Sequence, residues 1–358
     1  MTTLVSSPAE ASAVVRPVRY RFLDALRGAA LCGILFVNLK DLVVLADANI
    51  GPHLLWRIYD VAIQGRFVPI FSFLFGVSAW LLYSSSVRRY ERRDAAAGES
   101  GAVKSARLLM VRRFLCLLVI GVAHWLLFYP GEILSMYAVM ALVLLVPAMF
   151  LPRTPVLAAG VVLTIAAYLT TGNSPLISAT LLITGFGAAQ FGLPAWFEST
   201  DRKDVMTSRI VFAVSAMVGV ALGVCQFLLL TDSIDSQLTA DLTGGIAGAA
   251  LAVAYTLGLS LLWRRTGARN VLDVVFSPLG KMALTNYVGA SAIIWVINQM
   301  IGGQVLPTVW LLPVISAAIL VLQWALSVLW LRYFSYGPIE WLWRMATRWE
   351  RVVIRAAR

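Results

Sequence analysis

The sequence predicts an all-α fold: a polytopic helix bundle that crosses a membrane about ten times, with both termini in the cytoplasm. The first observation behind this prediction is composition, because 60% of the 358 residues are apolar and only 13% are charged. A soluble protein of this size could not solvate so apolar a surface. The second is that the apolar residues fall in runs long enough to cross a hydrocarbon core of about 30 Å. The third, the distribution of basic residues, orients the bundle.

Short connections separate most of the predicted spans, as is typical of antiparallel neighbouring helices. The ten spans lie at residues 22–45, 66–87, 108–128, 132–151, 155–171, 175–193, 209–231, 242–263, 280–301 and 308–333. We expect a disordered cytoplasmic tail at 1–18, a transmembrane bundle at 19–335, and a basic, tryptophan-rich interfacial tail at 336–358. Glu340 and Arg344 in that tail have the spacing of a surface ion pair.

Basic residues alternate from loop to loop. Twenty-five of the 29 lysines and arginines lie in the two terminal segments and in alternate loops, whereas the opposite loops hold only Lys40, Arg57 and Arg66. The positive-inside rule therefore places both termini in the cytoplasm and predicts a multi-pass protein of the bacterial cytoplasmic (inner) membrane. The net charge of +11 then reflects topology, so we expect membrane lipids and no nucleic acid as partners.

An acid and a base lie at the mouth of the first span. Asp24 and Arg27 occur in RFLDALRGAALCGILFVNL at 21–39, and their spacing puts them on one helix face, where they can neutralise each other. Ionisable residues inside membrane helices are costly and usually mark functional sites. Arg112 and Arg113 end a basic loop that either binds a donor's phosphates or only sets the topology.

The second informative stretch is the hairpin around a Pro-Gly turn. His124 lies near the outer end of the third span and Glu132 opens the fourth, so the turn brings them to one level. A histidine beside a carboxylate can act as a general base. The alternative is a histidine bonded to backbone and a glutamate solvated in the turn. Asn38, about 21 Å above Asp24 by helix rise, is either an oxyanion donor or a polar helix end.

Other polar residues are weaker candidates. Asn286 and Tyr137 lie within predicted spans, and His53 lies in an outer loop, where a histidine is usually inert. The three cysteines show no close spacing, so neither a metal site nor a disulfide framework is expected. No HExxH, GxSxG or P-loop pattern occurs in the sequence, which leaves soluble-type protease, hydrolase and NTPase functions without support.

Five stretches together resemble a known bacterial family. They are LDALRGAALCGILFVNL (23–39), IFSFLFG (70–76), HWLLFYPGEILSMYA (124–138), GKMALTNY (280–287) and WLRYFSYGPIEWLWR (330–344). In combination they resemble the YeiB-like inner-membrane proteins, a group with a domain of unknown function. The region at about 150–275 carries no such landmark.

That family is distantly similar to transmembrane acyltransferases, including the heparan-alpha-glucosaminide N-acetyltransferase group, chiefly through the first helix. The resemblance implies that Asp24, Arg27, Gly28 and Asn38 lie on a helix beside an acyl-transfer site. The relatives' hairpin usually has His followed by Gly-Asp. This chain has Glu132 at that place, which keeps the carboxylate and lengthens it by one methylene.

Two function classes remain open at the level of the sequence. The first is an acyltransferase that takes an acyl group from a cytoplasmic thioester, such as acyl-CoA as co-substrate, without a bound cofactor. It would pass the group to a hydroxyl or amine of a lipid-linked or extracytoplasmic acceptor. The second is a transporter or flippase of small amphiphilic molecules. Against it, the matching halves show no pair of Gly/Pro-broken helices, the usual mark of a midplane substrate site.

Overall fold

The computed structural model describes residues 19–42, 54–98, 100–171, 175–229, 234–300 and 310–355. Helices make up nearly all of these ranges, and the pairing of extended chain within them is an isolated bridge between Phe334 and Arg355. The predicted all-α, membrane-type bundle is therefore confirmed.

Each of the ten predicted spans coincides with a helix or a helical segment. These are α1 (Arg21–Leu42), α3 (Phe67–Ala97), α4 (Ala102–Leu127), the series α5 (Leu134–Met140), η1 (Ala141–Leu145) and α6 (Val146–Ala148), α7 (Arg153–Thr171), α8 (Pro175–Gln190), α10 (Arg202–Leu229), α11 (Ile234–Trp263), α13 (Ala283–Met300) and α14 (Leu311–Leu331). The helices α2 (Leu54–Ala62), α9 (Leu193–Glu198), α12 (Thr266–Lys281) and α15 (Pro338–Arg348) lie between or after them.

Six stretches within the described ranges are long and apolar enough to cross a membrane. They are Arg21–Lys40, Arg57–Ala97, Arg153–Thr171, Arg202–Leu229, Thr239–Trp263 and Leu311–Leu331. Leu134–Ala148 and Pro175–Gln190 are apolar but shorter. The total of ten crossings and the sidedness of the termini stay predictions.

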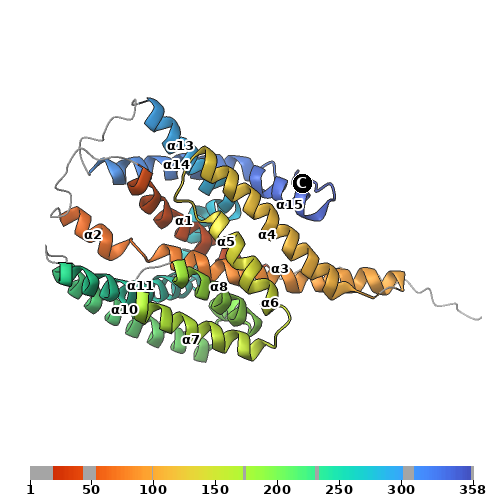
Figure 1. The fold of residues 1–358 in the computed structure, drawn as a ribbon, viewed down its shortest axis with the longest axis horizontal. Coiled ribbons are helices and arrows are strands. Elements are labelled where there is room, and N and C mark those ends of the chain that lie inside the picture. The colour runs from red at the N-terminus through yellow and green to blue at the C-terminus, as the bar shows by residue number, and fades with distance from the viewer. Residues whose placement is uncertain are drawn as a thin grey trace, which may run out of the picture.

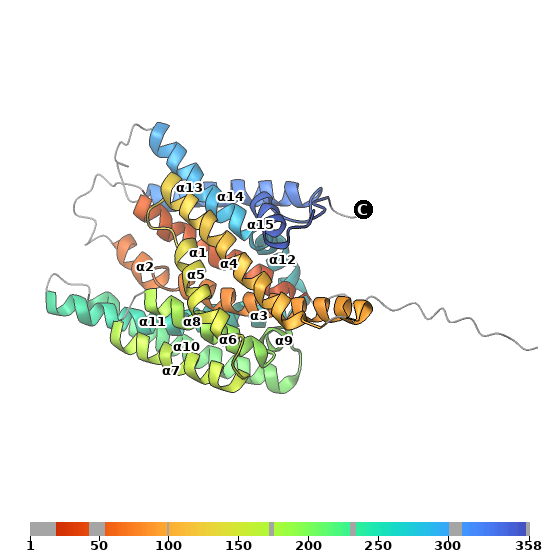
Figure 2. The same cartoon turned by 45° about the vertical axis from the view of Figure 1, so that its right-hand side comes forward.

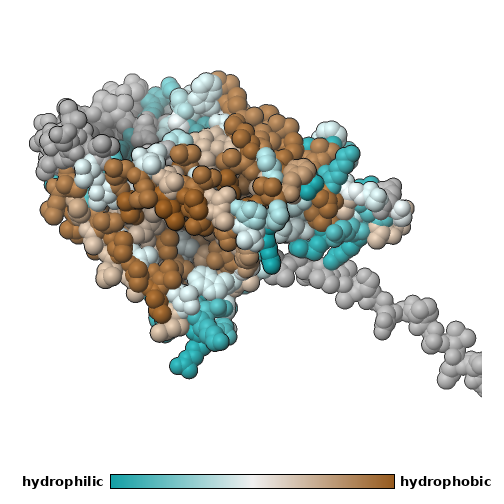
Figure 3. Space-filling model, turned by 60° about the horizontal axis from the view of Figure 1, so that its bottom comes forward, coloured by the Kyte–Doolittle hydropathy of each residue, from teal (hydrophilic) through white to brown (hydrophobic). Residues whose placement is uncertain are grey.

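The long helix α3 runs through the middle of the bundle. In Figures 1 and 2, α7, α8, α10 and α11 lie on one side of α3, and α1, α4, α13 and α14 lie on the other. The second half of α3 and the first half of α4 extend beyond the rest of the bundle at the end where α15 lies (Figure 1). Figure 3 shows a broad apolar surface over one face of the molecule, as expected of helices that face lipid.

Helices α1 and α12 pack at a pair of glycines. A Cβ on Gly28 would lie 2.0 Å from the carbonyl oxygen of Phe276, and a Cβ on Gly280 would lie 1.8 Å from that of Asp24. Because glycine has no side chain, the two backbones can approach each other directly. Residues 264–281, which the sequence predicts to be an inner loop, therefore contain a helix that packs on the first span.

The fourth predicted span is interrupted by a π-helical turn. In η1 the chain widens, and the Val146 N–H donates to the Ala141 carbonyl five residues back. Pro147 has no N–H, and its ring would clash with the carbonyl four residues earlier in a regular α-helix. The wider turn relieves that clash.

The C-terminal helix α15 is docked on the bundle. The Glu340 carboxylate accepts hydrogen bonds from the backbone N–H groups of Leu284 (2.7 Å) and Thr285 (3.0 Å), so it caps the start of α13. The expected surface pair with Arg344 is not formed; that guanidinium lies 4.1 Å from the ring centroid of Tyr336. Capping two backbone N–H groups at a helix end stabilises the fold more than an exposed ion pair, since such a pair contributes little stability.

Candidate functional site

The α4–α5 hairpin brings His124 and Glu132 together, as the sequence predicted. His124 Nδ1 lies 3.9 Å from Glu132 Oε2, and the two side chains are 1% and 0% exposed. The helices can approach this closely because a Cβ on Gly121 would lie 2.4 Å from the backbone nitrogen of Ser135. The acid and the base therefore meet in a buried setting at one end of the bundle.

Glu132 is held in place by the first turn of α5. Its carboxylate accepts hydrogen bonds from the Ser135 N–H at 2.9 Å, from the Ser135 hydroxyl and from the Leu134 N–H. These backbone donors have no partner inside the helix, and the helix dipole favours a negative charge there. The alternative of a glutamate solvated in the turn is wrong, because the carboxylate is a buried helix cap.

The imidazole of His124 is unpartnered. Neither ring nitrogen has a hydrogen-bond partner within the described part of the chain, and the 3.9 Å separation from Glu132 is too long for a hydrogen bond. The rings of Tyr287 (5.3 Å between centroids, edge to face) and Phe128 (6.0 Å) flank it. The alternative of a histidine bonded to backbone is therefore also wrong. Buried polar atoms without partners are rare and call for an explanation.

Tyr287 completes this cluster and was not among the predicted residues. Its hydroxyl accepts a hydrogen bond from the Ile133 N–H at 3.3 Å, and its side chain lines a small cavity together with Asn38. It thus lies where α1, the hairpin and α13 meet. The motif GKMALTNY, which ends at this tyrosine, was the available signal. We call Asn38, His124, Glu132 and Tyr287 the outer cluster.

A small cavity lies beside the outer cluster, between α1, α13 and α14. Its volume is about 20 Å³, and its polar lining comes from Asn38, Asn286, Tyr287 and Gln323. This is room for about one water molecule.

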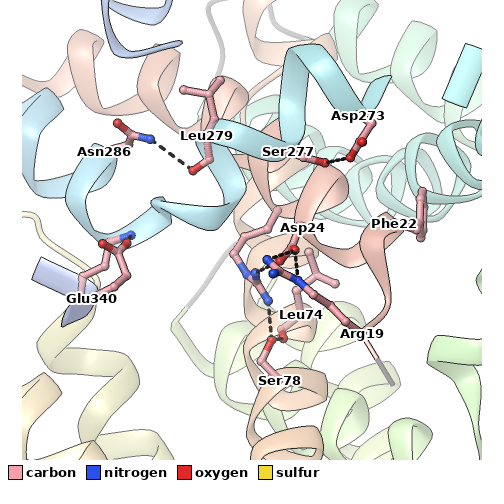
Figure 4. A network of polar contacts seen from close by, with 12 residues as sticks. Arg19, Phe22, Asp24, Leu74, Ser78, Asp273, Ser277, Leu279, Asn286 and Glu340 are labelled. Atoms are coloured by element: carbon pink, nitrogen blue, oxygen red, sulfur yellow. Dashed lines mark hydrogen bonds and ion pairs between the residues drawn. The ribbon is translucent and has the colours of Figure 1, made fainter. Parts of the chain in front are cut away.

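The neighbouring Asn286 has a structural role. Its side-chain amide donates to the Leu279 carbonyl (3.2 Å, Figure 4) and to the Ser327 hydroxyl (3.0 Å). Its backbone carbonyl accepts a hydrogen bond from the Gln323 side chain at 2.7 Å. These bonds join α12, α13 and α14. The predicted candidate is thereby accounted for by packing of these helices.

The predicted ion pair at the opening of α1 is present, with an added partner. Asp24 lies 3.2 Å from Arg27 and 2.7 Å from Arg19. Arg27 also donates to the Ser78 hydroxyl of α3 at 2.8 Å; Figure 4 shows Arg19, Asp24 and Ser78 gathered at this place. Asp24 and Arg27 are only 14% and 22% exposed, so they fasten α1 to α3 near the end of the bundle at which α1 begins.

The remaining candidates make contacts of their own. Arg112 and Arg113 lie against the rings of Trp349 (4.0 Å) and Trp343 (3.5 Å) of the C-terminal segment, contacts that hold this segment to α4.

Tyr137, fully buried, lies 2.5 Å from the Ser72 hydroxyl between α5 and α3. His53 lies outside the described residues. Among the residues that are described, no group of three or more His, Cys, Asp or Glu side chains is placed to hold a metal ion.

The chain matches a family model and several known proteins. Residues 194–350 match the model of the family described as "Protein of unknown function (DUF418)". The chain is 31% identical to "Uncharacterized 39.9 kDa protein in amylase 3'region" of Bacillus acidopullulyticus, over 91% of this chain and 92% of the relative. It is 27% identical to YxaH of Bacillus subtilis (92% and 94% covered) and 23% identical to YeiB of Escherichia coli K12 (91% and 95% covered).

No solved structure matches the chain significantly. The relatives are matched over more than nine tenths of their own length and of this chain. This chain is a membrane-type helical protein that belongs to the YeiB-like family, a family of unknown function.

Proposed function

We propose that this protein is an acyltransferase of the bacterial cytoplasmic membrane and that His124 is its general base. The observation that carries the proposal is the His124 ring, buried without a hydrogen-bond partner on either nitrogen and 3.9 Å from a buried carboxylate. A protein gains no stability from such a group. Unpaired, buried titratable groups with a specific charge partner are characteristic of functional sites.

The proposed reaction uses one nitrogen of the ring for each neighbour. Nδ1 faces Glu132, which leaves Nε2 for the hydroxyl or amine of the acceptor. The acceptor's oxygen or nitrogen bonds to the thioester carbonyl carbon while His124 takes its proton. The resulting oxyanion then collapses, the carbon–sulfur bond breaks, and the leaving thiolate takes the proton back from the imidazolium. The carboxylate of Glu132 stabilises that imidazolium by its charge.

The remaining members of the outer cluster supply hydrogen-bond donors. The Asn38 amide and the Tyr287 hydroxyl, which line the same small cavity, are available to a negative oxygen that develops beside His124. Preorganised donors of this kind are often the largest single contribution to catalysis of acyl transfer.

The Asp24–Arg27 pair marks the proposed entrance of the donor. It lies about 21 Å from Asn38 by helix rise along α1, so the thioester arm would run beside this helix. The cavity of about 20 Å³ at Asn38 has no room for an acyl group. Donor entry therefore requires that α13 or α14 moves away from α1.

Acyl transfer is tested with the purified full chain in nanodiscs of total bacterial lipid, supplied with acetyl-CoA that is labelled in the acetyl group. We expect release of free thiol and transfer of label to the lipid fraction. His124→Ala should lower both by about 10²-fold or more, the usual contribution of a general base. The matched control is Trp125→Ala, because this neighbouring side chain is 49% exposed on the outer face of α4.

Full activity of a folded His124→Ala protein would overturn the proposed mechanism. Accumulation of an amphiphilic substrate in vesicles without any thiol release would instead support the alternative, a transporter.

A further inference from the structure

A second cavity lies far from the outer cluster, where α10 begins and α11 ends. Its volume is about 420 Å³, within the range of small-molecule sites. Its lining consists of Thr200, Val205, Arg209, Phe212, Leu261, Arg264 and Arg265. The proposed acyl transfer uses none of these residues.

Arg264 is fixed in the wall of this cavity. Its Nη2 donates to the Trp196 carbonyl at 2.8 Å and its Nε to the Phe197 carbonyl at 3.3 Å. The third nitrogen, Nη1, is buried and has no hydrogen-bond partner among the described residues. An arginine held by two carbonyls is preorganised, and a guanidinium in the wall of a cavity suits an oxyanion.

The charge around Arg264 is incompletely balanced. Burial lowers the pKa of the Arg264 guanidinium, and the carboxylate of Asp204 opposes that shift. Asp204 itself accepts a 2.5 Å hydrogen bond from the Ser199 hydroxyl. Arg209 and Arg265, both exposed, add two more positive charges to the lining, so the cavity is set up for an anion.

Part of the lining is apolar, and this apolar part continues onto the outside of the bundle. Phe212 and Leu261 line the cavity. Along α10, Met206 and Ile210 are 55% and 53% exposed, as is typical of a face that meets lipid. A ligand with an anionic head and an apolar tail fits both parts.

We infer that this cavity binds the phosphate of an anionic phospholipid, with Arg264 as the central contact, Arg209 and Arg265 at the rim, and an acyl chain along α10. Basic pockets between membrane helices commonly hold such head groups on the cytoplasmic side. The charge pattern of the sequence predicts that this end of α10 is cytoplasmic. A lipid is favoured over free phosphate because the apolar face of α10 begins directly beside the arginines.

Native mass spectrometry of the purified full chain in neutral detergent tests this site. Phosphatidylglycerol and phosphatidylcholine with identical chains are titrated separately, and inorganic phosphate is added as a competitor. Both lipids carry a phosphate, but the quaternary ammonium of choline adds a positive charge beside the three arginines, so we expect wild-type protein to bind phosphatidylglycerol about tenfold more tightly than phosphatidylcholine. Millimolar phosphate should not displace the lipid.

Three variants test whether the preference for phosphatidylglycerol arises in this cavity. Arg264→Gln should weaken phosphatidylglycerol binding about tenfold. The double variant Arg209→Gln/Arg265→Gln, whose exposed side chains are not needed for folding, should weaken it several-fold. Arg202→Gln is the control, an exposed arginine on the same helix that does not line the cavity, and should bind as wild type does.

Equal binding of the two lipids by wild-type protein would overturn the inference. So would an undiminished preference in the double variant. Displacement of phosphatidylglycerol by phosphate would identify a free-anion site and reject the lipid. Each result is independent of acyl transfer.

Discussion

Removal of the Glu132 carboxylate should destabilise the α4–α5 hairpin. In Glu132→Ala, the backbone N–H groups of Leu134 and Ser135 lose their acceptor. Each buried donor left without a partner costs about 1–3 kcal/mol, so the pair should lower the free energy of unfolding by about 2–6 kcal/mol. Glu132→Gln keeps one acceptor oxygen but directs an NH₂ group at the same donors, and should cost about half as much.

The assay is thermal unfolding in detergent, followed by the intrinsic fluorescence of the chain's 12 tryptophans. The expected order of melting temperatures is wild type, then Glu132→Gln, then Glu132→Ala. The control is Ser135→Ala, which removes only the hydroxyl donor and should cost about 1 kcal/mol. If Glu132→Ala melts at the same temperature as wild type while Ser135→Ala shows its expected small loss, the carboxylate does not stabilise the start of α5. That result would refute the reasoning.

Three further predictions concern packing and topology. In the same melting assay, Gly28→Ala and Gly280→Ala should each lower the free energy of unfolding by about 1–3 kcal/mol or more, which is the cost of overpacking. The control Gly267→Ala, with no atom within 4 Å of the added Cβ, should be neutral, and equal melting temperatures for all three variants would contradict the close approach of α1 and α12. Trp343→Phe removes the 2.9 Å hydrogen bond from the indole to the Arg113 carbonyl, so limited proteolysis should release the C-terminal segment faster than in wild type; unchanged cleavage would mean that this bond does not hold α15. A cysteine in place of the exposed Lys104, in a background without native cysteines, should react with a membrane-impermeant maleimide only after the inner membrane is opened; labelling from the periplasmic side would reverse the predicted orientation.

Tertiary structure added most where a residue's neighbours come from distant segments. Tyr287 was not selected from the sequence, because its neighbours Asn38 and Ile133 belong to α1 and to the turn between α4 and α5, and no spacing along the chain predicts their meeting. Helix α12 was missed because the basic residues Arg264, Arg265, Arg269 and Lys281 suggested a loop. Its signal was present, since Leu272, Phe276 and Leu279 recur at helical spacing, and all three pack inside the bundle or line its cavity.

The sequence by itself determined the fold class, the positions of the ten apolar helical segments and the meeting of His124 with Glu132. It did so because span length, loop charge and a tight turn are local properties. Only the tertiary structure decided that Glu132 caps a helix, that Arg112 and Arg113 lie against tryptophans, and that the His124 ring has no hydrogen-bond partner among the described residues. These outcomes depend on how each helix is rotated about its axis, which close packing across the whole bundle sets.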